Sequence, residues 1–245
     1  MNFYKSIFKT IIRDKGIANI GGANRLLEGH AIVWQRGRLS YIACDTTFGS
    51  TVLIPAFEPK TYKEIKTSQG RLFVDVGAYT GVYSILASDK FEKVISLEPN
   101  PITFEVLKRN VELNHLTNVE VVQKAASDNI DTITIYEGLW SSTYTAIRDF
   151  IFAKPEGITI QVQGIRLDGL LSSYDSIDLL KIDVEGYEIN VLHGMEGILP
   201  RVRKIIVEAD KENQVTISRI LHNFEIFVLE EGNISDNLMF RNLSR

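Results

Sequence analysis

Phe73-Val-Asp-Val-Gly-Ala-Tyr-Thr-Gly-Val-Tyr83 is the stretch that decides the fold of this chain. It is typical of a short buried strand that ends close to a carboxylate, turns through two glycines and continues into a helix. Such a turn is expected to place bare backbone amides and a helix N-terminus next to a polar or anionic ligand. The stretch is also compatible with an ordinary connection between a strand and a helix, so other residues must decide whether it binds anything.

The spacing of the glycines separates this loop from the fingerprint that binds dinucleotides. Asp75 stands where Gly-x-Gly-x-x-Gly has its first glycine, and only Gly77 and Gly81 follow. A loop with an acid and fewer glycines suits a cofactor that has an amino-acid end and no pyrophosphate. S-adenosylmethionine (SAM) is such a cofactor, and a nicotinamide dinucleotide is the weaker alternative.

Composition and charge restrict the class of protein. Of 245 residues, 44% are hydrophobic and 24% are charged, which is the balance of a folded globular protein with a full core. The formal net charge of −4 offers no overall attraction for a polyanion, so a nucleic-acid substrate is disfavoured. We expect one main domain with a small extension.

The extension is predicted over residues 1–60 and the main domain over residues 61–245. Residues 1–15 have apolar side chains at helical spacing among lysines and an arginine, which predicts a basic amphipathic helix. This helix either docks on the domain or contacts a membrane or a partner from the periphery. A β-hairpin is expected to follow at Ala31–Trp34 and Leu39–Cys44.

The cellular compartment follows from two further features. Cys44 is the only cysteine, so it cannot form an internal disulfide, as is usual in a reducing compartment. No apolar run approaches the ~18 residues that a membrane-spanning helix needs. We therefore expect a cytoplasmic protein, with peripheral membrane association through residues 1–15 as the alternative. The sequence does not indicate an oligomeric state.

From Arg71 onward, strand and helix patterns alternate. This alternation predicts an α/β fold with a doubly wound, mostly parallel sheet and helices on both faces. A helix is expected to start at Pro101 with Asn100 as its N-cap, and a hairpin inserted at Ile133–Tyr136 and Ile158–Val162 interrupts the order. The predicted core strands are Leu72–Val76, Lys93–Leu97, Val119–Val122, Ile177–Ile182 and Lys204–Val207, with two late strands around Glu225–Leu229 and Asn237–Arg241.

Three acids fall at the carboxyl ends of predicted strands, where open α/β sheets bind their ligands. They are Asp75, Glu98 and Asp183. A carboxylate at Glu98 can accept two hydrogen bonds from a ribose diol, although the acid could also simply favour the start of the next helix. Ala126 lies in a run of small residues after the third strand, where a flat adenine would have room.

The second dense group of charges is Asp178-Leu-Leu-Lys-Ile-Asp-Val-Glu-Gly-Tyr-Glu188. An acidic cluster of this kind is costly unless its members pair or bind something. Asp183 and Glu185 are candidates for a catalytic base or a substrate-orienting group, with Lys181 tuning them. The alternatives are an internal pair for Lys181, a plain helix-start role for Glu188, and a divalent metal on Asp183 and Glu185, which is not favoured.

These motifs together resemble the FkbM family of SAM-dependent methyltransferases. The resemblance rests on Phe73–Gly81, Leu97-Glu-Pro-Asn-Pro101, Ile165-Arg-Leu-Asp168 and Leu180–Glu188. It implies a class I, Rossmann-like methyltransferase fold and O-methylation of a hydroxyl on a sugar, a polyketide or another small metabolite. By position, it implies that Asp75, Gly77 and Gly81 line the methionine end of the cofactor, that Glu98 takes the ribose, and that Asp183, Glu185 and Gly186 border the transfer site. The other predicted cofactor-binding residues are Ala78, Tyr79, Thr80, Pro99, Ala126 and Asp183.

The expected function is therefore transfer of a methyl group from SAM to a small-molecule or glycan hydroxyl by in-line displacement. The protein needs to align the hydroxyl and exclude water, and a well-placed base adds about 10²–10⁴-fold. Two other classes stay open. A nucleic-acid methyltransferase should show a basic face, and a non-catalytic scaffold should lack acids that are present here.

Overall fold

The computed structural model describes residues 24–27, 29–36, 39–43, 58–137, 144–146 and 157–244, with side chains described from Glu58 onward. The predicted helix over residues 1–15 and Cys44, the last residue of the predicted hairpin, lie outside these ranges. Within the described part of the chain, no helix combines the length and the apolar character that crossing a membrane requires.

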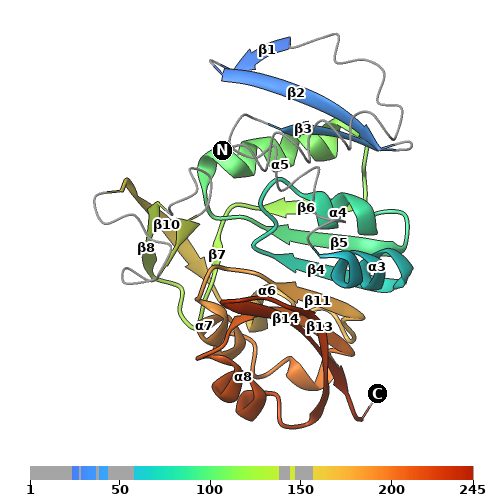
Figure 1. The fold of residues 1–245 in the computed structure, drawn as a ribbon, viewed down its shortest axis with the longest axis vertical. Coiled ribbons are helices and arrows are strands. Elements are labelled where there is room, and N and C mark those ends of the chain that lie inside the picture. The colour runs from blue at the N-terminus through green and yellow to red at the C-terminus, as the bar shows by residue number, and fades with distance from the viewer. Residues whose placement is uncertain are drawn as a thin grey trace.

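A seven-stranded sheet forms the centre of the molecule, in the order β13-β14-β12-β11-β4-β5-β6 (Figure 1). Only β14 runs against the others, because β12 and β13 both pair with it in antiparallel fashion. The predicted mostly parallel sheet is therefore confirmed. Its strands are β4 (Gly70–Val76), β5 (Phe91–Leu97), β6 (Val119–Val122), β11 (Leu179–Ile182), β12 (Lys204–Asp210), β13 (Phe224–Glu231) and β14 (Ser235–Asn242).

Both faces of the sheet are covered by helices, as the apolar strands require. Phe73 and Leu179 point to the face covered by α3 (Pro59–Thr67), α4 (Val82–Ala87) and α5 (Pro101–Leu113). Val74 and Leu180 point to the opposite face, which packs against α6 (Leu167–Leu170), α7 (Glu188–His193) and α8 (Gln214–Ile220). The prediction of helices on both faces is confirmed.

The start of α5 follows the predicted capping chemistry. Asn100 has an extended backbone, and its side chain accepts a hydrogen bond of 2.9 Å from the amide of Ile102. Pro101 fits the first position because an amide there has no partner within the helix. This cap fixes the chain directly after the carboxyl end of β5, where Glu98 lies.

A second sheet is inserted between β6 and β11, in the order β7-β10-β8-β9. The predicted hairpin is its centre, with β8 (Thr132–Glu137) antiparallel to β10 (Thr159–Ile165). The structure adds two short strands, β7 (Ala125–Ala126) and β9 (Tyr144–Thr145). Figure 1 shows this sheet on the side of the molecule toward which β4 and β5 point.

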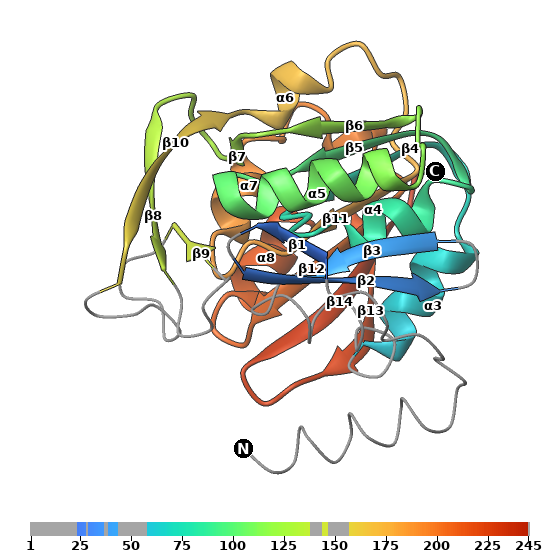
Figure 2. The same cartoon turned by 90° about the horizontal axis from the view of Figure 1, so that it is seen from above.

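The first three strands form a small sheet of their own, with β1 (Asn24–Leu27), β2 (Gly29–Arg36) and β3 (Leu39–Ala43) in antiparallel order. The pairing of β2 with β3 confirms the predicted hairpin. Figure 2 shows this sheet alongside α5, which β3 contacts. It covers the helix layer from outside as a sheet separate from the central one.

Candidate active site

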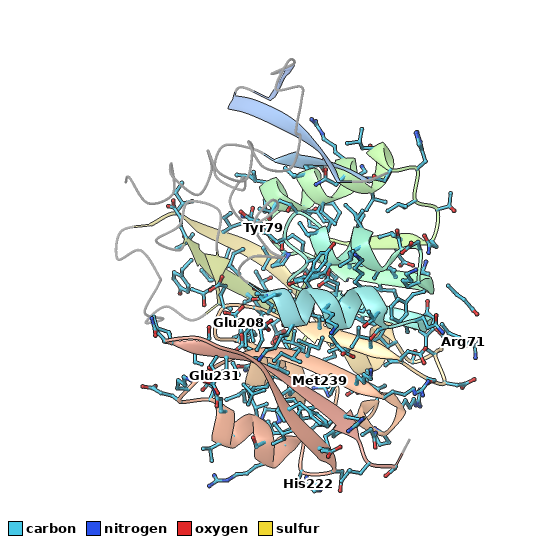
Figure 3. The ribbon with its side chains drawn as sticks, turned by 45° about the vertical axis from the view of Figure 1, so that its right-hand side comes forward. Arg71, Tyr79, Glu208, His222, Glu231 and Met239 are labelled. Atoms are coloured by element: carbon cyan, nitrogen blue, oxygen red, sulfur yellow. The ribbon has the colours of Figure 1, made fainter. Side chains whose placement is uncertain are left out.

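Strand register places charged side chains side by side at the carboxyl end of the central sheet. Lys181 pairs with Asp75 of the neighbouring strand β4, and Ile182 pairs with Val207 of β12. Asp183, which follows β11 directly, therefore lies beside Glu208. Figure 3 shows Tyr79 and Glu208 at one end of the sheet and Arg71, at the start of β4, at the other.

Lys181 is a buried cation at the centre of this group, with 2% of its surface exposed. Its Nζ atom lies 2.7 Å from Oδ2 of Asp183 and 5.1 Å from the ring centroid of Tyr83. Burial alone would lower the pKa of the ammonium, but Asp183, Asp75 and Glu58 outweigh it and raise the pKa. The surrounding carboxylates therefore favour the charged form of Lys181, and the internal pairing expected as one alternative is present.

Asp75 is buried, and one of its two carboxylate oxygens has no hydrogen-bond partner. Its Oδ2 atom accepts a hydrogen bond of 2.6 Å from Ser84, whose hydroxyl is in turn bonded to Ser96 at 2.7 Å. Its Oδ1 atom is buried and has no hydrogen-bond partner. Burial raises the pKa of this carboxyl, against the opposing effect of Lys181. An orphaned carboxylate oxygen at this place fits a ligand that brings an ammonium or hydroxyl donor.

The two glycines of the Asp75–Gly81 loop are required by its packing. Gly77 has φ of +79°, and a Cβ atom there would lie 1.8 Å from the carbonyl oxygen of Asp183. Gly81 has φ of +85°, and its Cβ atom would lie 2.4 Å from Leu107 of α5. Side chains at these positions would hold the loop away from Asp183 and from α5. The glycines thus bring the loop and the acidic cluster into contact.

The expectation that this loop presents bare backbone amides is wrong for four of its residues. The amides of Gly77 and Ala78 both donate to the carbonyl of Leu97, at 3.0 and 2.9 Å. The amide of Gly81 donates to Ala78 at 2.7 Å, and that of Tyr79 donates to Glu98 at 2.9 Å. A tight turn with φ of 52° at Tyr79 folds these groups back onto the protein. Anion binding by these loop amides is therefore not available.

Glu98 is buried directly after β5, and its carboxylate accepts hydrogen bonds from three donors. Its Oε2 atom accepts from the amide of Tyr79, while Oε1 accepts from the amide of Asn100 at 2.9 Å and the hydroxyl of Thr103 at 2.8 Å. Burial raises its pKa to about 7, although these hydrogen bonds oppose the shift. Both sequence interpretations therefore have support: Glu98 organises the start of α5, and Oε2 keeps a lone pair for a ligand hydroxyl.

Ala126 contributes no free side-chain surface. It is 5% exposed, belongs to the core on the α6–α8 side of the sheet, and pairs with Ile165 in the inserted sheet. An adenine contact at this position would have to use the backbone. The predicted role of Pro99, which is half-buried beside Glu98, stays a prediction.

The turn after Asp183 leaves Glu185 half-buried and buries Glu188. Glu185 and Gly186 both have positive φ, at 54° and 96°, and the carbonyl of Glu185 accepts a hydrogen bond of 2.7 Å from Thr145 of β9. Burial, followed by the charge of Asp183, raises the pKa of Glu185 to about 8. Glu188 is 2% exposed; its Oε1 atom accepts from Gly186 at 2.9 Å, and its Oε2 atom is buried without a partner.

Sequence reasoning missed two acids of this cluster. Glu208 lies within β12, close to the carboxyl ends of the strands, so the rule that selected Asp75 and Asp183 could have found it. Glu58 precedes α3 and has no comparable signal, yet its Oε2 atom accepts a hydrogen bond from the hydroxyl of Tyr83. The charge of Asp183, followed by burial, raises the pKa of Glu208, while burial is the main cause of the raised pKa of Glu58.

The cluster is therefore strongly acidic around a single buried lysine. Its six acids are Glu58, Asp75, Asp183, Glu185, Glu188 and Glu208. Such an environment favours a cationic ligand and repels phosphate. Among the described residues, no group of three or more His, Cys, Asp and Glu side chains is arranged to hold a metal ion.

The raised pKa values of three acids should make the stability of the free protein depend on pH. Glu98, Glu185 and Glu188 have folded-state pKa values of about 7, 8 and 7, which lie above the ordinary value of 4.5. The native state therefore binds more protons than the unfolded state between these limits, and its stability falls as the pH rises through them. We expect the Tm of the free protein to fall between pH 6 and pH 8.5, by about 2–4 °C for each kcal/mol lost. A Tm that is constant or rises over this range, measured by calorimetry, would contradict the assignment.

Comparison with known proteins gives this geometry a context. Residues 75–231 match the family described as the methyltransferase FkbM domain. Methyltransferase sdnD of Sordaria araneosa is 27% identical over an alignment of 208 residues that covers 71% of this chain and 80% of that protein. Hexuronic acid methyltransferase AglP of Haloferax volcanii is 29% identical over 136 residues, covering 55% of this chain and 54% of that protein.

Solved structures agree on the fold. A methyltransferase FkbM from Methylobacillus flagellatus has a TM-score of 0.50 at 20% identity, covering 83% of this chain and 56% of that one. Trm5b from Pyrococcus abyssi has a TM-score of 0.52 at 13% identity, covering 86% of this chain and 55% of that one. The chain thus spans about half the length of these two proteins. The likeness shows the class I methyltransferase fold.

Proposed function

Because the chain belongs to the FkbM methyltransferase family, we propose that it uses SAM to methylate a hydroxyl group of a sugar, a polyketide or another small metabolite. The observation that carries this proposal is the acidic cluster at the carboxyl end of the sheet, with an orphaned carboxylate oxygen on Asp75. The names of the relatives support it, because one is a methyltransferase and another acts on a hexuronic acid.

The residues at the strand ends fit the charges of this cofactor. Oδ1 of Asp75 can accept a hydrogen bond from its ammonium, and the surrounding carboxylates favour its sulfonium. Oε2 of Glu98 can accept from a ribose hydroxyl. The loop from Gly77 to Gly81 would then act through its shape and side chains, because four of its amides are bonded within the protein. Ala126 and Pro99 remain candidates for backbone or packing contacts with the adenosine.

When bound, SAM supplies an electrophilic methyl group. The protein must hold the acceptor hydroxyl in line with it and take up the hydroxyl proton. Asp183 and Glu185 are our candidates for that base, and the pKa of about 8 at Glu185 matches a base that works near neutral pH. Lys181 is a positioning residue, since its Nζ atom fixes Oδ2 of Asp183 at 2.7 Å.

Replacing Asp183 with Asn tests the assignment of the base. With a hydroxyl acceptor found by screening for release of S-adenosylhomocysteine (SAH), we expect kcat to fall by about 10²–10⁴-fold, because the carboxylate no longer accepts the proton. The affinity for SAH, measured by calorimetry, should change little. Asp131→Asn, which changes an exposed aspartate directly before β8, is the matched control. Full turnover in Asp183→Asn would remove Asp183 from the mechanism.

A further inference from the structure

We propose that Thr145 is a positioning residue for the methyl transfer, which holds Glu185 at the transfer site by fixing the peptide group that follows it. This inference rests on the proposed function, because it takes Glu185 to be a candidate base. It gives the inserted sheet a part in the reaction, since the short strand β9 supplies Thr145.

The peptide group between Glu185 and Gly186 is held at both ends. Its carbonyl oxygen accepts a hydrogen bond of 2.7 Å from the hydroxyl of Thr145. Its amide, on Gly186, donates to Oε1 of Glu188 at 2.9 Å. The two partners come from different elements, β9 and α7. Because a peptide group is planar, these two bonds fix its orientation and with it the backbone angles on either side.

The backbone at Glu185 needs this support. Its φ of 54° lies in the left-handed region, which residues with a Cβ atom rarely adopt. Gly186, with φ of 96°, has no such restriction. A residue with a side chain keeps a conformation of this kind only where the surrounding structure enforces it. The hydrogen bond from Thr145 therefore helps to decide in which direction the side chain of Glu185 leaves the chain.

The other candidate base does not depend on Thr145. The amide of Asp183 donates to the carbonyl of Val76 at 3.0 Å, and its Oδ2 atom lies 2.7 Å from Nζ of Lys181. The central sheet thus fixes Asp183, whereas the inserted sheet fixes the peptide group after Glu185. Loss of the Thr145 hydroxyl should displace Glu185 and leave Asp183 in place.

Thr145 is itself held firmly in the inserted sheet. It is 2% exposed and pairs with Tyr136 of β8. Ala146, the next residue, packs against the apolar core of this sheet, and so does Tyr187 from the turn that carries Glu185. Figure 2 shows β9 on the side of β8 that faces the central sheet. The inserted sheet therefore contacts this turn through a hydrogen bond and through apolar packing.

The surroundings of Glu185 provide a readout of its position. Its side chain is half-buried, and burial is the main cause that raises its pKa to about 8. The charged groups that act on it are Asp183, Glu188 and Asp210, which raise the pKa, and Lys181, which lowers it. A displaced carboxyl group would regain water, so its pKa would fall toward the ordinary value of 4.5.

The first measurement follows this titration in the free protein by NMR, with glutamate labelled with ¹³C at the side-chain carboxyl group. The resonance of Glu185 is the one that Glu185→Gln lacks. Thr145→Val keeps the shape of the side chain and removes the donor. We expect its titration midpoint to be lower than that of the wild type by at least about one pH unit. Thr132→Val, which removes an exposed hydroxyl of β8, is the matched control and should leave the midpoint unchanged.

The second measurement is turnover with the hydroxyl acceptor found by screening for release of SAH. We expect Thr145→Val to lower kcat by about 10–100-fold, because a small displacement of a catalytic group has an effect of that order. Its affinity for SAH should match that of the wild type, since Asp75 and Glu98 lie on other strands. Thr145→Ser, which keeps the hydroxyl, should regain most of the lost kcat.

The outcomes separate this inference from the proposed function. An unchanged midpoint for Glu185 in Thr145→Val, or a wild-type kcat in that variant, overturns the positioning role of Thr145. Equal losses of kcat in Thr145→Val and Thr145→Ser also overturn it, because the hydroxyl would then not be the group that matters. A wild-type protein that fails to bind SAH would instead overturn the proposed function.

Discussion

Gly77→Ala is expected to destabilise the protein by at least about 3 kcal/mol and to abolish cofactor binding. The new Cβ atom would lie 1.8 Å from the carbonyl oxygen of Asp183, and an alanine with φ of +79° is strained even without that overlap. Asp183 cannot move aside cheaply, because its amide donates to the carbonyl of Val76 at 3.0 Å. Thermal unfolding should show a Tm lower by about 6–12 °C.

Gly169→Ala is the matched control for this experiment. Gly169 lies in α6, and a Cβ atom there would meet no atom within 4 Å. Alanine in a helix is favoured over glycine by about 0.5–1 kcal/mol, so this variant should be as stable as the wild type or slightly more so. If Gly77→Ala matches Gly169→Ala in Tm and in affinity for SAM, the contact between the loop and Asp183 has been misassigned.

Glu98→Gln is expected to weaken SAM binding by about 100-fold or more. The carboxylate now accepts from Tyr79, Asn100 and Thr103, and a carboxamide can accept on one side only. The NH₂ group of the new carboxamide would face a donor, and the ribose would lose an acceptor. One charged hydrogen bond and one unsatisfied donor together account for about 3 kcal/mol, which corresponds to that factor.

A comparison of ligands shows which end of the cofactor Glu98 holds. Adenosine has the ribose but lacks the methionine, so Glu98→Gln should weaken adenosine and SAM by the same factor. Asp75→Asn should weaken SAM and leave adenosine unchanged, because Asp75 is assigned to the ammonium. A Glu98→Gln variant that loses affinity for SAM but not for adenosine would contradict the ribose assignment.

Much of the site was predictable from where acids fall relative to strands. Asp75, Glu98 and Asp183 each follow or end an apolar run, and parallel strands bring such ends to one edge of a sheet. The same rule selects Glu208, which directly follows the predicted end of the fifth strand at Val207, although the observed strand continues to Asp210. The observed strand reaches further because β14 pairs with it over its full length.

Other features depend on contacts that no local pattern contains. Glu58 reaches the cluster only because α3 packs Ile65 against the sheet and Glu230 binds its first turn. The amides of Gly77 and Ala78 looked available in the sequence, but the carbonyl of Leu97, on a neighbouring strand, takes both. Small residues near Ala126 indicated space, and the inserted sheet fills it. Each of these is set by tertiary packing.

Binding of SAM by isothermal calorimetry tests the central claim most directly, with NAD titrated in parallel. The acidic cluster, the orphaned oxygen of Asp75 and the free lone pair of Glu98 predict one SAM bound per chain. They predict no binding of NAD, because its pyrophosphate would meet carboxylates and loop amides that are already bonded. Binding of NAD, or no heat with SAM, would contradict the account.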